Sequence, residues 1–223
     1  MRKNIQILTL VATVFADYIG FSLVIAIFPP ILLHNNPPFL AAGTSEFWRN
    51  TILGLLTAAY PVSQFFGAPI FGSLSDQYGR KKIMQITLLG SSLSYVASAI
   101  AMLLPSITLL FASRILAGLF AGNLTLAQAG IGDLSTNETR TKNFSYVSSA
   151  GALAFVIGPI LGGRIADWFN IAAPFYVAAG LFVIVLLVFR RVFTESNRPR
   201  AITTRFSLLS GFNNIKNMTR LPQ

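Results

Sequence analysis

The sequence contains no cysteine, one histidine and few charged residues. Without cysteine, disulfide bonds and thiolate metal sites are excluded. His34 stands beside Asn35 and Asn36 and is expected to be a solvated loop residue. The sequence also shows no nucleophile–base pair, metal-ligand cluster or phosphate-binding loop. We therefore predict neither an enzyme nor a cofactor.

Charged residues make up 11% of the chain and hydrophobic residues 53%, whereas a soluble domain carries roughly 25% charged residues. This composition predicts an integral all-α membrane protein. Six apolar runs are long enough to cross a bilayer: 5–33, 51–75, 83–104, 106–129, 144–166 and 171–192. The first run is too long for a secretory signal, and it contains Asp17. We assign residues 1–195 to the six-helix bundle.

The net charge of +10 is explained by membrane topology. If the N-terminus is cytoplasmic, all basic residues except Arg49, Arg114 and Arg164 fall in cytoplasmic segments, as the positive-inside rule requires. The C-terminal tail is then cytoplasmic as well. Residues 196–223 would begin a central loop, with a short amphipathic helix within 205–220 on the membrane surface. Nucleic acid is not a predicted partner.

Two ionisable residues lie deep in predicted spans. At about 1.5 Å per residue, Asp17 is roughly 16 Å from the inner end of the first span and Arg114 roughly 12 Å from the outer end of the fourth. An unpaired charge there costs at least ~2.5–3.5 kcal/mol. We expect either an ion pair between Asp17 and Arg114 or a water-filled cavity that both share.

Polar residues repeat at helical spacing in the second span, where Thr57, Tyr60 and Gln64 share one face. They could form ordinary interhelical hydrogen bonds or the wall of a cavity. In the fourth span, Gln128 lies on nearly the same helix face as Arg114.

The segment 72–82 joins the second and third spans and contains Gly72, Asp76, Gly79 and Arg80. Gly79 suits a tight turn because glycine adopts positive φ at low cost. The three consecutive cations from Arg80 mark the cytoplasmic side. The positive-inside rule does not account for Asp76, which is an acid, so we expect this residue to have another role.

The fifth span contains Gly158, Pro159, Gly162 and Gly163. Glycines let another backbone come close, and a proline would kink the helix. The spacing of Pro159, Gly162 and Asp167 repeats that of Pro69, Gly72 and Asp76, although the second and fifth spans run in opposite directions. Such a pattern is typical of an inverted-topology repeat, here helices 1–3 against 4–6.

These motifs resemble those of the major facilitator superfamily. Segment 72–82 matches its G-x-x-x-D-x-x-G-R-[KR]-[KR] loop, and residues 110–122 match its fourth-helix motif. Residues 158–163 match the motif of its drug/proton antiporters. Asp17, Gln64 and Asp133 also stand where the tetracycline-efflux branch has such residues. Ser94 replaces an acid of the tetracycline pumps, so tetracycline itself is not implied.

The resemblance implies the N-terminal six-helix half of such a transporter, in a bacterial inner membrane. It implies export of a hydrophobic or amphipathic compound in exchange for protons. Asp17 would be the proton or cation site and Arg114 its partner, with Tyr60, Gln64 and Gln128 lining the pocket. An uncoupled facilitator and a non-transporting fragment or partner subunit are the alternatives.

The resemblance also implies a gate and a partner. Asp76 would pair with Arg80, and Asp133 would complete a charge network that holds the outward-facing state. Because the family has twelve helices, a second six-helix half is expected from a separate chain or a missing segment.

Overall fold

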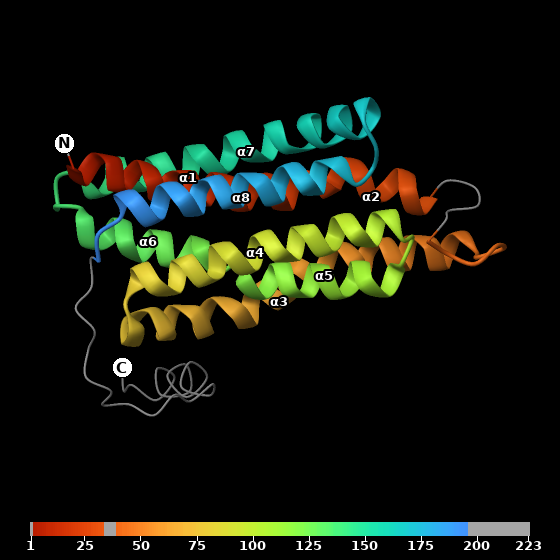
Figure 1. Cartoon of the computed structure of the whole chain (residues 1–223), viewed down its shortest axis with the longest axis horizontal. Coiled ribbons are helices and arrows are strands. Elements are labelled where there is room, and N and C mark those ends of the chain that lie inside the picture. Colours follow the sequence, from red (N-terminus) through yellow and green to blue (C-terminus); the bar gives the residue numbers. More distant parts are fainter. Residues whose placement is uncertain (1, 34–38, 196–223) are drawn as a thin grey trace, which may run out of the picture.

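A computed structural model describes residues 2–33 and 39–195. His34 and the predicted surface helix within 205–220 lie outside the described residues. The described part is all helical, with no strand. Its helices run lengthwise through one bundle (Figure 1): α1 Arg2–Ser22, α2 Val24–Leu33, α3 Glu46–Tyr78, α4 Arg80–Leu103, α5 Ile107–Phe120, α6 Asn123–Leu134, α7 Arg140–Trp168 and α8 Ala173–Val192.

Six helices of the described chain are long and apolar enough to cross a membrane. Two of them are interrupted. The first, Lys3–Leu33, is divided at Leu23 into α1 and α2, and the fourth, Ile107–Leu134, is divided at residues 121–122 into α5 and α6. We refer to the six as spans 1 to 6.

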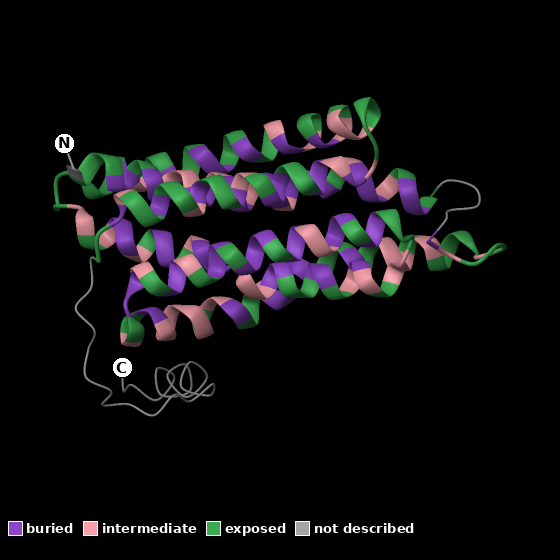
Figure 2. Ribbon diagram, viewed as in Figure 1, coloured by how far each residue is buried: buried purple, intermediate pink, exposed green. Residues whose placement is uncertain are grey.

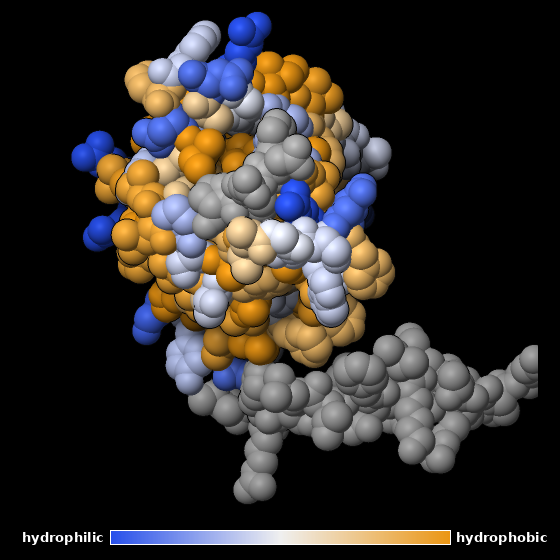
Figure 3. All heavy atoms as spheres, turned by 90° about the vertical axis from the view of Figure 1, so that its right-hand side faces the viewer, coloured by the Kyte–Doolittle hydropathy of each residue, from blue (hydrophilic) through white to orange (hydrophobic). Residues whose placement is uncertain are grey.

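The outer surface is apolar on several helices. Phe65 of α3, Leu93 of α4, Val156 of α7 and Ile184 of α8 each expose 60% or more of their area. Buried residues gather where helices face one another (Figure 2), and apolar side chains cover much of the surface seen end-on (Figure 3). Such a surface would be unfavourable in water. The chain is an integral, multi-pass membrane protein.

The packing of spans 1–3 is repeated in spans 4–6, whose helices run in the opposite direction. Span 2 packs on span 4 (α3 on α5), span 5 packs on span 1 (α7 on α1), and span 3 packs on span 6 (α4 on α8). Exchanging spans 1–3 with spans 4–6 maps this set of contacts onto itself. The interruptions in spans 1 and 4 correspond in the same way. The predicted 3+3 repeat is therefore present in the fold.

The glycines of span 5 bring α7 close to span 1. A side chain at Gly158 would overlap Ser22, and one at Gly162 would lie 2.8 Å from the Leu23 backbone oxygen. Gly163 faces Ala26, while Pro159 is half-buried within α7, which is helical throughout. The packing contact of this motif is made mainly by its two buried glycines.

The predicted link at 72–82 is mostly helix, which corrects the expectation of a loop. Helix α3 continues to Tyr78, and Gly79 alone separates it from α4. Gly79 has a φ of 92°, a conformation that favours glycine. Residues 73–78 contain no proline or glycine, so continuing the helix through them satisfies their backbone groups.

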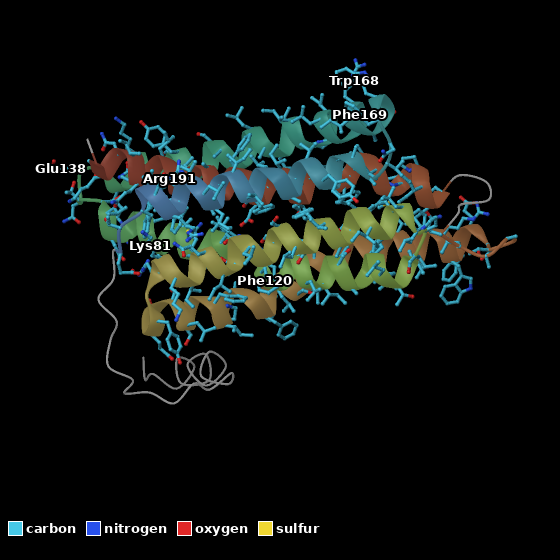
Figure 4. All side chains as sticks on the ribbon, in the orientation of Figure 1. Lys81, Phe120, Glu138, Trp168, Phe169 and Arg191 are labelled. Atoms are coloured by element: carbon cyan, nitrogen blue, oxygen red, sulfur yellow. The ribbon has the colours of Figure 1, made fainter. Side chains whose placement is uncertain are left out.

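The two ends of the bundle differ. Lys81, Glu138 and Arg191 lie at the end where α1 begins and α8 ends, whereas Trp168 and Phe169 lie at the opposite end (Figure 4). The N-terminus and the last described helix therefore reach the same side. We call this side the charged end.

Candidate functional site

A cavity of about 230 Å³ lies between α1, α3 and α6. We call it the Asp17 cavity. Asp17 is the one charged residue in its lining, and the Phe21 and Tyr60 rings pack against each other with centroids 5.1 Å apart. The lining residues are Asp17, Tyr18, Phe21, Tyr60, Pro61, Gln64 and Leu124. Aromatic rings around a single acid suit an amphipathic ligand.

Asp17 has one hydrogen-bond donor within the described chain. The residue is 5% exposed, and Oδ1 accepts a bond of 3.0 Å from Asn123 Nδ2. Oδ2 is buried and has no hydrogen-bond partner among the described residues. The sequence reasoning did not find Asn123. An amide directly after Gly122 in an apolar span was the available signal.

Arg114 lies apart from this cavity, among aromatic rings. The residue is 1% exposed, and Nη2 donates a bond of 2.6 Å to Ser98 Oγ. The guanidinium carbon lies 4.8 Å from the centroid of the Tyr95 ring and 5.6 Å from that of Phe175. These rings provide a cation–π environment in place of a carboxylate.

The expected pairing of Asp17 with Arg114 is not formed. No ion pair joins these two described residues, and the lining of the Asp17 cavity does not include Arg114. The sequence placed both at similar depth but could not show that Ser98 and Tyr95 already surround the guanidinium.

The two glutamines lie in different cavities. Gln64 lines the Asp17 cavity and donates a bond of 3.0 Å to the Ala121 oxygen, at the interruption of span 4. Gln128 lines a neighbouring cavity of about 240 Å³, which shares Tyr18 and Leu124 with the first. The structure thus brings Asp17, Tyr60 and Gln64 together and places Gln128 beside them.

A second polar cluster lies at the charged end and is centred on Arg80. Arg80 Nε is 3.1 Å from Asp133 Oδ2, and Nη2 is 3.8 Å from Asp76 Oδ1. Glu195, which the sequence reasoning missed, accepts hydrogen bonds from the backbone nitrogens of Arg80 and Lys81 at 3.0 and 3.1 Å. A carboxylate at a helix N-terminus satisfies free N–H groups and favours the helix dipole. We call these residues the Arg80 cluster.

Two inverted three-helix repeats, a buried acid and a charged cluster beside the turn between spans 2 and 3 are together typical of a class of membrane transport proteins. Residues 10–221 match the Major Facilitator Superfamily, and the chain belongs to this family.

The chain is also similar to individual proteins. The chain is 30% identical to the class C tetracycline resistance protein of Escherichia coli over 98% of this chain and 53% of that protein. It is 32% identical to the quinolone resistance protein NorA of Staphylococcus aureus, over 83% and 44%. The crystal structure of the human organic anion transporter MFSD10 (TETRAN) superposes with a TM-score of 0.75 at 25% identity, over 97% of this chain and 53% of that one. The chain thus spans about half the length of these relatives.

Proposed function

We propose that the chain forms part of a transporter that exports a hydrophobic or amphipathic compound in exchange for protons. Two similar proteins are named for resistance to tetracycline and to quinolones. Both names are consistent with removal of an amphipathic compound from the cell. The aromatic lining of the Asp17 cavity offers such a compound apolar contacts and one acid.

Asp17 is the proposed proton site. The observation that carries this role is its buried carboxyl group, whose Oδ2 has no partner among the described residues, in the wall of a cavity. An ionised carboxylate in the bilayer is costly unless a cation or water compensates it. A proton or a cationic group of the substrate would each compensate it, and the two would compete. Because binding of one releases the other, this competition would be sufficient to exchange protons for substrate.

A fixed salt bridge is the opposing account of Asp17. It would use Asp17 only to orient spans 1 and 4 through Arg114. The absence of an ion pair between these described residues favours the proton role instead. Arg114 is held instead by Ser98 and the Tyr95 ring.

The charged end would face the cytoplasm of a bacterial inner membrane. It carries Arg80, Lys81, Arg190 and Arg191, as the positive-inside rule requires. A second six-helix half would complete the transport path. The Arg80 cluster would gate that path by holding spans 2, 3 and 4 together at the cytoplasmic side.

The test is proton-driven accumulation of ethidium, an amphipathic fluorescent cation, in everted vesicles. The protein would be a full-length transporter containing this chain, or the chain co-expressed with a second half. Asp17→Asn should abolish accumulation driven by a pH gradient yet preserve downhill ethidium exchange. Asp167→Asn, the same change at an exposed acid of α7, should leave both unchanged. Intact uphill transport in Asp17→Asn would refute the proton role.

A further inference from the structure

Asn123 connects three helices beside the Asp17 cavity. It is fully buried and is the first residue of α6. Its Nδ2 donates a bond of 3.0 Å to Asp17 Oδ1 on α1 and lies 3.5 Å from Ser91 Oγ on α4. Its Oδ1 accepts a bond of 2.5 Å from Thr87 Oγ1, also on α4. Spans 1, 3 and 4 therefore meet at one amide group.

The bond from Thr87 determines which way this amide points. An asparagine side chain carries donors on one side and an acceptor on the other. The Thr87 hydroxyl also lies 3.0 Å from the Met84 backbone oxygen, and its one proton serves the shorter contact to Asn123 Oδ1. With the acceptor side of the amide occupied in this way, the NH₂ group is directed at Asp17. Thr87 has no hydrogen bond to Asp17 and acts on it through Asn123.

The interruption of span 4 places Asn123 there. Helix α5 ends at Phe120 and α6 begins at Asn123. Gln64 donates to the Ala121 oxygen within the gap, and a side chain at Gly122 would lie 3.1 Å from the Phe71 Cβ. The gap is thus held against α3, on the side of the cavity.

We propose that Asn123 and Thr87 are positioning residues for Asp17, and that the proton is bound at Asp17 Oδ2. This inference rests on the proposed role of Asp17 in proton exchange. Oδ1 accepts the Asn123 bond in both protonation states, first as a carboxylate oxygen and then as the carbonyl oxygen of the acid. Oδ2 is buried and has no partner among the described residues, and Asp17 lines the cavity, so an O–H bond forms at Oδ2 when the site opens enough for a hydronium ion to deliver its proton. The same bond breaks when the proton returns to water.

The other ionisable groups around Asp17 do not occupy Oδ2. Tyr18 and Tyr60 line the same cavity from α1 and α3. Arg114 on α5 directs its hydrogen bond at Ser98 and lies beside the Tyr95 ring of α4. Among the described residues, Asn123 is therefore the one side chain that donates a hydrogen bond to Asp17.

Infrared difference spectroscopy tests this assignment, because a protonated carboxyl group has a distinct C=O stretching band. The protein would be reconstituted into lipid vesicles, and spectra at acidic and neutral pH would be subtracted. The band lost in Asp17→Asn belongs to Asp17. If the carbonyl oxygen is Oδ1, the Asn123 bond lowers the frequency of this band, and Asn123→Leu should move it to higher frequency.

Thr87 provides a second, milder test. Thr87→Val should shift or broaden the Asp17 band although residue 87 has no hydrogen bond to Asp17, and Thr87→Ser should restore it because the hydroxyl returns. Thr9→Val is the matched control. Thr9 is buried in α1, and its hydroxyl donates to the Ile5 backbone oxygen, so its loss should leave the band unchanged.

The outcomes separate this inference from the proposed function. An Asp17 band that stays in place in Asn123→Leu and Thr87→Val would mean that the proton sits on Oδ1. The positioning proposal would then be wrong, while the proton role of Asp17 would stand. Absence of an Asp17 band at every pH would overturn both. If Asn123→Leu fails to fold, the comparison of Thr87→Val with Thr87→Ser decides.

Discussion

Arg80 Nε lies 3.1 Å from Asp133 Oδ2, and this contact ties the start of α4 to the end of α6. The second acid beside Arg80 is placed less favourably. Asp76 is 3.8 Å away, with its side chain 61% exposed against 36% for Asp133. Water screens the Asp76 pair more strongly, so the two acids should differ in their effect on stability.

Asp133→Asn should lower the free energy of unfolding by about 1 kcal/mol, and Asp76→Asn by less than about 0.5 kcal/mol. Thermal unfolding in detergent measures both. Glu138→Gln, at an exposed acid nearby at the same end of the bundle, is the control and should change little. Equal losses for Asp133→Asn and Asp76→Asn would contradict the ranking.

The gate proposal makes a separate prediction about rates. Asp76→Asn and Arg80→Ala should slow transport in a completed transporter and leave membrane insertion intact. Ethidium efflux rates, normalised to the amount of inserted protein, would show this. A normal rate in Asp76→Asn would leave topology as the explanation of segment 72–82.

Glu195→Ala should loosen the first turn of α4. Its carboxylate accepts the backbone N–H groups of Arg80 and Lys81, and loss of such a cap costs about 1 kcal/mol. Hydrogen exchange followed by mass spectrometry should show faster exchange in the peptide that contains residues 80–84. Glu195→Gln keeps an acceptor oxygen and should lie between wild type and alanine. Unchanged exchange in Glu195→Ala would show that the cap does not stabilise α4.

Gly162→Ala should destabilise the packing of α7 on span 1. A Cβ there would lie 2.8 Å from the backbone oxygen of Leu23, which cannot move aside as a side-chain end could. Overpacking of this kind costs about 1–3 kcal/mol. Gly180→Ala is the matched control, since a Cβ at Gly180 meets nothing within 4 Å. If both variants unfold at the same temperature, the close approach at Gly162 is unimportant.

The chain by itself should not transport. A second half is proposed to cover the exposed face of α7 and to complete the path. Everted vesicles containing only residues 1–223 should therefore show no substrate-dependent proton flux, whereas vesicles that also contain a second half should. A robust flux from these residues alone would indicate that two copies complete the fold.

Much of the fold could be predicted because its signals are local. Apolar runs predicted the spans, and paired motifs in spans 2 and 5 predicted the inverted repeat. The end of α3 at Tyr78 was harder to predict from the sequence. A glycine and several charges suggested a loop at 72–82, but the backbone bonds of residues 72–78 are satisfied by continuing the helix to Tyr78.

The site was harder to predict because its contacts join distant segments. Asp17 was identifiable as a lone acid in an apolar span, whereas its partner Asn123 lies 106 residues further on. Glu195 reaches Arg80 over a similar separation. Arg114 was found, but its neighbours depend on how spans 3, 4 and 6 pack, which spacing along one helix does not reveal.

The central claim is that Asp17 exchanges a proton for substrate, and proton release on substrate binding tests it most directly. The purified, completed transporter would be mixed with ethidium in weakly buffered solution containing a pH indicator. The account predicts that saturating ethidium releases protons from the wild type and from Asp167→Asn, and none from Asp17→Asn, which still binds the dye. Equal release from Asp17→Asn and the wild type would contradict it.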